Sequence, residues 1–353
     1  MSEILRCKED DLPVLFELFI EVYKHNPRMQ ERNFFDWQFK DHPGNENGEY
    51  SFWIEWDGSK IIGFLGYTLI EYIYDDKIST GCWSYNWYTS GSNGSGLNLI
   101  YKLWDEFDNR FHIGLSCASI DILNRLNVPL LSKMPRRIGI IDSETVFKLF
   151  SINDDSSRKI LKSSEEQLSV YKDSGNIRFV KRFSDRDDFN FDDHPTVKGY
   201  VRRSGKFLNW RYFDIPGHNY KAITGPGNMF AVYRIEKIMD EKDSIIKIID
   251  WNFSGEPALN ALSFIQKDAI DSGAIMIDFF CTDSGTNKFF ESNGFINEDS
   301  VSEFIPFLFR PLNLEQGAIS LAIDIPPHMK KRNIDFSEWY ISRGDGDIDR
   351  IKL

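Results

Sequence analysis

Residues 35–44 read FDWQFKDHPG, and residues 208–217 read LNWRYFDIPG. The two stretches lie 173 residues apart, and their Trp, Asp, Pro and Gly residues coincide. Phe39 also stands opposite Tyr212. A single short match can arise by chance, so its weight depends on whether other segments repeat in the same order.

Two further pairs of segments do match in that order. Residues 3–6 (EILR) correspond to residues 176–179 (NIRF), and residues 113–117 (IGLSC) correspond in character to residues 276–281 (MIDFFC). Three matches in one order predict a duplicated domain. The predicted units are a first domain at 1–150, a polar linker at 151–175, a second domain at 176–310 and a tail at 311–353. The aromatic pair Trp339 and Tyr340 predicts that the tail docks on the body.

The composition fits two globular domains and excludes several classes of function. A chain of 353 residues is long for one domain. Its net charge of −12 disfavours general nucleic-acid binding, which needs clustered Lys and Arg. The uncharged window 78–101 is too rich in Ser, Thr, Asn and Gly to cross a membrane, and residues 1–11 show no apolar signal segment. We therefore expect no membrane and no nucleic-acid partner.

The cysteines point to the compartment. Cys7, Cys82, Cys117 and Cys281 are scattered and form no CxxC pair. This usage is typical of a reduced, cytoplasmic protein without a zinc site, so we expect no metal. The sequence fits a monomer or a homodimer. The run Asp345-Gly-Asp347-Ile-Asp349 imitates part of a calcium loop, but no Glu follows, and we expect a solvated acidic tail there.

Hydrophobic patterns predict an α+β fold. Apolar residues recur at helical spacing over 11–23, and a second short helix is expected at 33–39. Residues 50–56 and 60–74 read as strands around an Asp-Gly turn, with a third strand at 79–89 and a helix at 97–107. The second copy follows the same order. The predicted architecture is two tandem domains, each a mixed twisted β-sheet flanked by helices.

A glycine-rich loop joins the third strand to its helix. Residues 91–96 read GSNGSG, and glycine there leaves backbone N–H groups pointing outward at a helix N-terminus. Such a place favours an anion such as a pyrophosphate. A Walker loop is excluded because no Gly-Lys-Ser/Thr follows, and the GxGxxG spacing of dinucleotide sites is absent. An ordinary glycine-rich turn is the alternative interpretation.

In its element order, this loop resembles the acyl-CoA pyrophosphate loop of the GNAT N-acyltransferase superfamily. Gly94 and Gly96 fit the family signature, whereas Gly91 replaces its usual Gln or Arg. Residues 287–295 (NKFFESNGF) resemble the late helix of the family. The Trp repeat followed by Asp-x-Pro also resembles tandem GNAT enzymes that N-acylate dTDP-linked 3-amino-3,6-dideoxyhexoses for O-antigen or capsule synthesis. The resemblance implies direct attack of the amine on an acyl-CoA thioester, the acyl group being acetyl or 3-hydroxybutyryl.

The resemblance also implies an acyl-donor site in the first copy. It places the backbone N–H at Asn86 against the thioester carbonyl. The residues it assigns to acyl-CoA are Asn86, Trp87, Tyr88, Gly91, Ser92, Asn93, Gly94, Ser95, Gly96 and Asn124. In the second copy the corresponding loop, 252–257 (NFSGEP), has one glycine and carries Glu and Pro. We therefore expect acyl-CoA in the first copy alone, with the second copy helping to hold the acceptor.

The catalytic base is not readable from the strand that usually carries it. No Asp, Glu or His occurs from Ile78 to Trp104, so the base must come from another segment or a water chain must remove the proton. His25, between the first two helices, is the candidate, and a surface histidine is the alternative. Residues expected to contact the acceptor are Trp37, Tyr85, Trp210, Arg211, Trp251 and Asn252.

These acceptor assignments have simpler alternatives. Trp37 and Trp210 can serve as core anchors, and Arg211 can form a salt bridge with Asp214. Two other functions remain open for the chain: a Fem-like transferase that uses aminoacyl-tRNA, and a catalytically inactive pair that acts as a binding or scaffold protein. Because the chain is acidic, a cleft that takes phosphorylated ligands must be locally basic.

Overall fold

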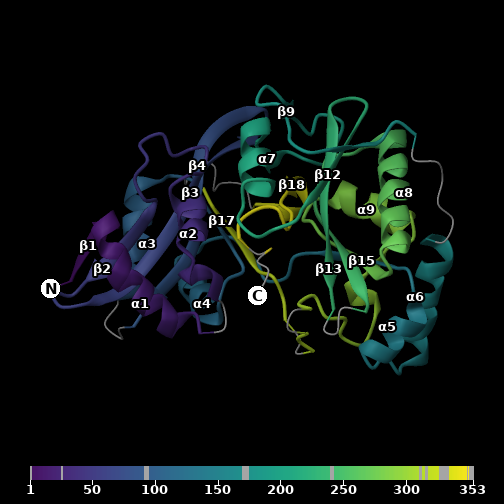
Figure 1. Cartoon of the computed structure of the whole chain (residues 1–353), viewed down its shortest axis with the longest axis horizontal. Helices are drawn as coiled ribbons and strands as arrows, with labels where there is room; N and C mark the ends of the chain where they lie inside the picture. The colour runs from purple at the N-terminus through teal and green to yellow at the C-terminus, as the bar shows by residue number, and fades with distance from the viewer. Residues whose placement is uncertain are drawn as a thin grey trace.

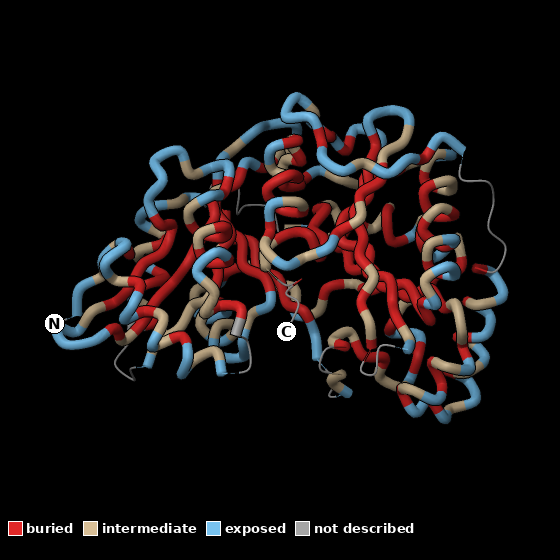
Figure 2. The backbone as a smooth tube through the Cα atoms, viewed as in Figure 1, coloured by how far each residue is buried: buried red, intermediate tan, exposed pale blue. Residues whose placement is uncertain are grey.

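The computed structural model describes residues 2–24, 27–90, 95–168, 175–238, 242–309, 312–314, 317–325, 334–347 and 349. The molecule is elongated, with two lobes side by side and α7 (Gly205–Tyr212) between them (Figure 1). Buried residues continue from one lobe into the other through the middle of the molecule (Figure 2). The lobes are therefore joined by a shared core.

The first half follows the predicted element order. Its elements are β1 (Glu3–Arg6), α1 (Leu12–Val22), α2 (Arg32–Phe39), β2 (Phe52–Trp56), β3 (Ile61–Tyr74), β4 (Lys77–Thr89), α3 (Ser95–Glu106), β5 (Arg110–Ile113), α4 (Cys117–Arg125) and β6 (Leu130–Leu131), with the short 3₁₀ helices η1 (Glu9–Asp11) and η2 (Pro27–Gln30). Neighbouring residues of β3 face opposite sides of the sheet. Phe64 packs with Phe19, from α1, and Leu65 lies in the cluster of Leu99, from α3.

The second half repeats that order only from α7 onward. Between its first strand and α7 it has three short strands where the first half has α1, so the prediction that the second copy follows the same order is wrong for that segment. It contains β8 (Arg178–Val180), β9 (Asp188–Phe189), β10 (Gly199–Val201), β11 (Arg203–Ser204), α7, β12 (Lys221–Gly225), β13 (Met229–Lys237), β14 (Ser244–Trp251), α8 (Gly255–Asp271), β15 (Ala274–Phe280), α9 (Ser284–Ser292), β16 (Ile296–Asn297) and η3 (Glu298–Ser300). In both halves the fourth strand of the repeat pairs parallel with the fifth, β4 with β5 and β14 with β15. The predicted α+β class with mixed sheets flanked by helices is confirmed.

The two halves exchange their last strands. The first sheet runs β1-β2-β3-β4-β5-β17-β6, where β17 (Leu321–Asp324) lies antiparallel to β5. The second runs β16-β7-β15-β14-β13-β12-β8, where β7 (Arg136–Ile140) lies antiparallel to β15. The sheets therefore do not divide at residue 150, since β7 precedes that position and belongs to the second sheet. Helices α5 (Ser143–Leu149) and α6 (Asp155–Leu168) follow β7, and α6 occupies most of the predicted linker.

The C-terminal segment, residues 339–347 and 349, returns to the middle of the molecule. After η4 (Phe336–Glu338), β18 (Trp339–Tyr340) pairs parallel with β10, and β10 pairs antiparallel with β3 of the first sheet. Trp339 and Tyr340 are fully buried. Gly199 permits this approach, because a Cβ there would lie 2.5 Å from the Trp339 ring. The segment thus lies between the halves.

Candidate active site

Strand β4 carries a bulge at the residue predicted to face the thioester. Tyr85 pairs with Gly66 and Tyr88 pairs with Phe64, so Asn86 and Trp87 together oppose a single residue of β3. Asn86 has φ of +52°, a left-handed conformation that Asn tolerates better than most residues. Such bulges bend a strand and redirect its backbone groups. The bulge therefore bends β4 at the point where it leaves β5, while its pairing with β3 continues to Thr89.

Strands β4 and β5 part directly before this bulge. Their parallel ladder ends at the pair Ser84 and His112, while β4 runs on to Thr89. Residues 87–89 thus extend beyond the end of the β4–β5 ladder, next to the first turn of α3. An extended polar ligand can add to such an uncovered strand side through main-chain hydrogen bonds. The opening between β4 and β5 is called the first gap below.

Some of the residues predicted to bind acyl-CoA lie at this gap. The Trp87 indole Nε1 donates to the Gly96 carbonyl at 3.0 Å and ties β4 to the start of α3. Tyr88 stacks on Phe64, on the opposite face of the sheet. Asn124 lies exposed at the C-terminal end of α4. The loop residues Gly91, Ser92, Asn93 and Gly94 lie outside the described residues, as does the Ser95 side chain.

The second half has the equivalent gap, but its own chain fills it. The β13–β14 register shifts at Ile249, and the β14–β15 ladder ends at Ile248 and Phe279. The C-terminal segment enters there. The Gly344 N–H donates to the Ile249 carbonyl at 2.9 Å, and Ser342 forms an antiparallel backbone β-bridge with Cys281, beside the end of β15. The second gap is therefore closed by residues 341–344.

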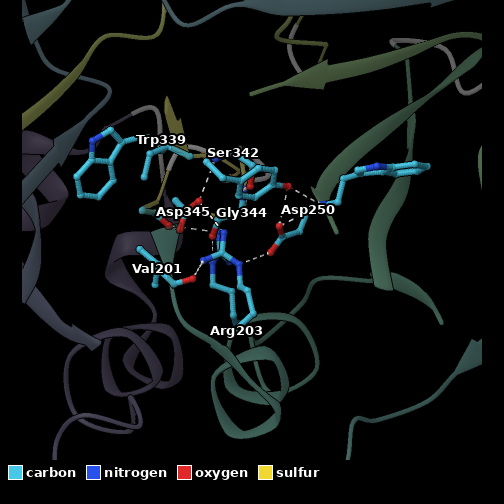
Figure 3. A network of polar contacts seen from close by, with 12 residues as sticks. Val201, Arg203, Asp250, Trp339, Ser342, Gly344 and Asp345 are labelled. Atoms are coloured by element: carbon cyan, nitrogen blue, oxygen red, sulfur yellow. Dashed lines mark hydrogen bonds and ion pairs between the residues drawn. The ribbon is translucent and has the colours of Figure 1, made fainter. Parts of the chain in front are cut away.

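A buried ion-pair network holds the segment in that gap (Figure 3). Arg203 pairs with Asp250 of β14 at 2.8 Å and with Asp345 of the segment at 2.7 Å. The hydroxyls of Tyr212 and Tyr340 both donate to Asp250. All five side chains are buried, Asp250 among them with no exposure. Charges removed from water in this way are stable only when they are fully paired, so the network fixes the position of the segment.

A second ion pair anchors the segment further along. Arg234 of β13 pairs with Asp349 at 2.9 Å, and the Tyr220 hydroxyl donates to the same carboxylate at 2.7 Å. Burial alone would raise the pKa of Asp349, but the Arg234 guanidinium outweighs it and holds that pKa well below its usual range. The expectation of a solvated acidic tail is therefore wrong for Asp345 and Asp349. Their counter-charges lie more than 100 residues earlier in the chain, so local sequence could not reveal the pairing.

The two copies of the repeated stretch contact each other at the centre. The Trp37 indole N–H donates to the Trp210 carbonyl at 2.8 Å, and the Trp210 indole N–H donates to the Trp37 carbonyl at 2.9 Å. The two rings stack with centroids 5.0 Å apart. This reciprocal contact is what an approximate two-fold axis between the halves requires. Helices α2 and α7 therefore meet as equivalent partners.

A small cavity lies beside this contact. It is lined by Phe34, Trp37, Gln38, Tyr85, Trp210, Arg211, Ile215, His218, Gly346, Asp347 and Asp349. Four of the predicted acceptor residues, Trp37, Tyr85, Trp210 and Arg211, thus come together. Its free volume of about 10 Å³ is room for roughly one water molecule. Tyr85 immediately precedes the β4 bulge, so the cavity adjoins the first gap.

Arg211 belongs to the wall of this cavity. It donates to the carbonyls of Gly344 at 2.8 Å and Gly346 at 3.2 Å. The alternative of a salt bridge between Arg211 and Asp214 is wrong, because Asp214 pairs with Arg182 at 2.6 Å. Arg211 therefore holds the C-terminal segment across the cavity.

The remaining predicted residues lie elsewhere. Trp251 is fully buried among Phe289 and Phe290, and its indole donates to the Phe253 carbonyl. Asn252 is buried and donates to the Asn190 carbonyl. Neither lines the cavity. His25 lies outside the described residues.

Sequence reasoning missed Asp347 as a site residue. It lies in the run GDGD at 344–347, where two glycines alternate with two acids. Both glycines are closely packed: a Cβ at 346 would lie 2.3 Å from Ile113, at the end of β5. The alternation of glycine with acidic residues was the one sequence signal that this backbone passes through a closely packed region. Asp347 is the carboxylate that this backbone brings into the cavity beside Tyr85.

No group of three or more His, Cys, Asp or Glu in the described part of the chain is arranged to hold a metal ion. Among the helices described, none is both long and apolar enough to span a membrane.

The likeness of the chain to known proteins is one of structure. Neither a family model nor a curated protein matches the sequence. A GCN5-related N-acetyltransferase from Anabaena variabilis matches with a TM-score of 0.55 at 11% identity, covering 91% of this chain and 72% of its own. A probable N-acyltransferase from Enterococcus faecalis matches with a TM-score of 0.53 at 10% identity, covering 92% and 72%.

A third neighbour was solved with an acyl donor. Saccharomyces cerevisiae N-myristoyltransferase with bound myristoyl-CoA matches with a TM-score of 0.53 at 10% identity, covering 92% of this chain and 78% of its own. At such identities the likeness shows the fold alone. Two tandem halves with the fold of GCN5-related acetyltransferases thus span most of this chain.

Proposed function

We propose that this chain is an acyl-CoA-dependent N-acyltransferase with one acyl-donor site, in the first gap. The observation that carries the proposal is the difference between two equivalent gaps. Both halves have a bulged strand that parts from its parallel neighbour, but the described part of the C-terminal segment makes its backbone contacts in the second gap. A duplicated fold that closes one of its two clefts with its own backbone keeps the other for a ligand.

The residues around the first gap fit an acyl-CoA. The extended pantetheine arm of the donor would add to β4 beyond Ser84, as an extra strand adds to a sheet edge. The glycine-rich sequence before Ser95 would present backbone N–H groups to the pyrophosphate at the positive end of α3. The bulge at Asn86 would aim a backbone donor at the thioester carbonyl. A neighbouring fold solved with myristoyl-CoA supports this choice of donor.

The chemistry would be a direct transfer. The acceptor amine attacks the thioester carbonyl, the C–N bond forms and the C–S bond breaks. The departing thiolate takes up the proton that the amine loses, so CoA leaves as the free thiol. We assign removal of the amine proton to Asp347, which lines the same cavity as Tyr85. Burial raises the pKa of the thiols of Cys7, to about 12, and of Cys82. These thiols are thus poor nucleophiles, which supports transfer without a covalent enzyme intermediate.

The proposal also specifies the acceptor. We propose the amino group of a nucleotide-linked amino deoxysugar such as a dTDP-3-amino-3,6-dideoxyhexose, with acetyl or 3-hydroxybutyryl as the acyl group. Two observations support this acceptor. The Trp-containing repeat resembles that of tandem GNAT enzymes acting on such sugars, and the wall of the cavity is aromatic. A free volume of about 10 Å³ is far below that of a sugar. The walls of the cavity must therefore move apart when the acceptor binds.

The setting proposed for this reaction is the cytoplasm. The four cysteines are unpaired thiols, three of them buried, as expected where disulfides are kept reduced.

The test is release of free thiol from a panel of acyl-CoAs mixed with dTDP-amino sugars. We expect turnover with one pair, and a fall in kcat of about 10²–10⁴-fold in Asp347→Asn, the usual worth of a general base. Asp335→Asn is the matched control, because Asp335 is an acid near the same end of the chain that caps η4. Absence of turnover across the panel, together with absence of CoA binding, would leave a binding or scaffold role.

A further inference from the structure

Arg28 differs from the other buried arginines in having no hydrogen-bond or ion-pair partner within the described part of the chain. It lies in η2, between α1 and α2, and only 1% of its surface is exposed. Its Nε and Nη1 atoms make no hydrogen bond, and none of the ion pairs among the described residues includes Arg28. Four other deeply buried arginines contact a carboxylate: Arg136, Arg203, Arg234 and Arg343. A fifth, Arg211, donates to the Gly344 and Gly346 carbonyls.

The unpaired charge cannot be removed by loss of a proton. Burial lowers the pKa of Arg28 from its ordinary value, but an arginine side chain stays protonated throughout the neutral range. Taking a charge out of water without a partner is strongly unfavourable. Among the described residues, the other buried arginines have ion-pair or hydrogen-bond partners, whereas Arg28 has neither. An anionic ligand would supply the partner that Arg28 lacks there.

The surroundings of Arg28 are shaped for a planar cation. The guanidinium lies over the Phe34 ring, 4.8 Å from its centroid. On another side, Gly217 has φ of +66°, and a Cβ there would lie 3.1 Å from Nη2. The charged and titratable groups close enough to influence Arg28 are Glu31, Tyr220 and Arg234. Its own charge in turn helps to lower the pKa of His218, chiefly depressed by burial, to about 4, so His218 is neutral at pH 7.

Arg28 lies close to the proposed point of acyl transfer. The next residue, Met29, contacts the bulge, because the Asn86 side-chain N–H₂ lies 3.8 Å from the Met29 sulfur. Two neighbours of Arg28, Phe34 and His218, line the central cavity. The cation thus lies on the α1–α2 side of the first gap, behind the wall of the cavity that adjoins it. A ligand anion held there belongs to a molecule that also reaches the gap.

We propose that Arg28 binds the anionic group, a carboxylate or a phosphate, of the amine acceptor. The inference rests on the proposed function and narrows its substrate class to amines that carry such a group. Arg28 acts as a positioning residue: it holds the acceptor so that the amine faces the β4 bulge. It also supplies the local positive charge that an acidic protein needs to take an anionic acceptor.

The test compares the free energy of unfolding of the wild type and Arg28→Met in sodium chloride, sodium acetate and sodium phosphate at equal ionic strength. We expect acetate or phosphate to stabilise the wild type and not Arg28→Met, and the two salts distinguish a carboxylate site from a phosphate site. In chloride, Arg28→Met should be at least as stable as the wild type, since it removes an unpaired buried charge. Arg182→Met, which removes an exposed arginine, is the control for general salt effects and should respond as the wild type does.

Two results would overturn the inference. One is an equal response of wild type and Arg28→Met to both anions. The other is a large loss of stability of Arg28→Met in chloride, which would show that Arg28 has a partner within the chain. Arg28→Lys keeps the charge and should keep part of the anion effect.

A separate titration with CoA keeps the inference distinct from the proposed function. Arg28→Met should bind CoA as the wild type does, while its KM for the acceptor rises about 10-fold or more and kcat changes less, because only a ground-state anchor is lost. Failure of every variant to bind CoA would contradict the proposed function and leave the anion result standing. Normal CoA binding without an anion effect would contradict the Arg28 inference alone.

Discussion

At position 344 the chain has room for a hydrogen atom and none for a methyl group. A Cβ there would lie 2.0 Å from the Tyr212 hydroxyl and 3.2 Å from the Ile249 carbonyl. The Gly344 N–H is also the group that bonds to β14 inside the second gap. Closure of the second gap therefore depends on the absence of a side chain at one residue.

We predict that Gly344→Ala lowers the free energy of unfolding by about 1–3 kcal/mol, the usual cost of overpacking a buried site. Urea denaturation measures the loss. Gly317→Ala is the control, because its Cβ would meet only the Phe307 ring at 3.3 Å and the site is exposed. A change of about 0.5 kcal/mol is expected there. Equal effects of the two substitutions would contradict close packing at 344.

Three buried histidines make the folded protein less stable at acidic pH. Burial lowers the pKa of His42, His112 and His218 from 6.5 to about 4 in each case. Between those two values the unfolded chain binds more protons than the folded one. Protons therefore favour unfolding, so the stability contributed by these groups is complete above pH 6.5 and falls as the pH drops towards 4.

We predict that His112→Asn flattens the pH dependence of unfolding between pH 6.5 and 4.5, by up to about 1.4 kcal/mol per pH unit. Urea denaturation at several pH values gives the slope. Ser84→Ala is the matched control: it removes the hydroxyl that bonds His112 Nδ1 but leaves the titrating ring buried. A wild-type slope retained in His112→Asn would show that this histidine does not titrate there.

At the scale of elements, the repeated helices α2 and α7 join the halves through Trp37 and Trp210. Each indole is both a stacking partner and a donor to the backbone of the other helix. Loss of one indole N–H leaves a buried carbonyl without its donor, whereas loss of the ring pair removes a contact that both residues share. The two residues should therefore be energetically coupled.

We predict a coupling energy of about 0.5–1.5 kcal/mol in a double-mutant cycle of Trp37→Phe and Trp210→Phe. Equilibrium unfolding of the four proteins measures it. Trp104→Phe is the control for loss of an indole alone, since the Trp104 Nε1 makes no hydrogen bond. Additive effects of the two central substitutions would contradict direct contact between the repeated helices.

The exchanged strands make each half incomplete. Without β17, β5 loses its antiparallel neighbour, and without β7, β15 loses its own. We predict that fragments 1–150 and 151–353 are insoluble when expressed singly and form a soluble complex when co-expressed, because an uncovered edge of a buried sheet aggregates. Size-exclusion chromatography and circular dichroism measure this. A folded, monomeric 1–150 fragment would contradict the exchange.

Local sequence patterns predicted the helices and strands. They could not predict which strands pair with partners far away in the sequence. The apolar run of β3 and the helical spacing of α1 are signals within a few residues, so their predicted bounds agree with the structure within about two residues. The exchange of β7 and β17 depends on partners more than 100 residues away. The repeat identified Trp37 and Trp210, but nothing in the sequence indicated that they touch. The acidic GDGD run was taken as solvent-exposed because its arginine partners are distant.

For the whole molecule, duplication followed by specialisation accounts for the arrangement. Two equivalent halves meet about an approximate two-fold axis, and each has a bulged strand beside a gap. The C-terminal segment breaks the symmetry, because it fills the second gap and carries Asp347 to the cavity beside the first. On the function proposed above, a symmetric pair would bind two donors, whereas this arrangement would leave one donor site and make the second half a wall for the acceptor.

Calorimetric titration with CoA tests this claim most directly, using one added charge in each half. Gly94→Asp places a carboxylate directly before α3, and Ser254→Asp places one at the N-cap of α8. We predict one CoA per wild-type chain, an affinity at least about 10-fold weaker in Gly94→Asp through repulsion of the pyrophosphate, and unchanged binding in Ser254→Asp. Two CoA molecules per chain, or loss of binding in Ser254→Asp with retention in Gly94→Asp, would contradict it.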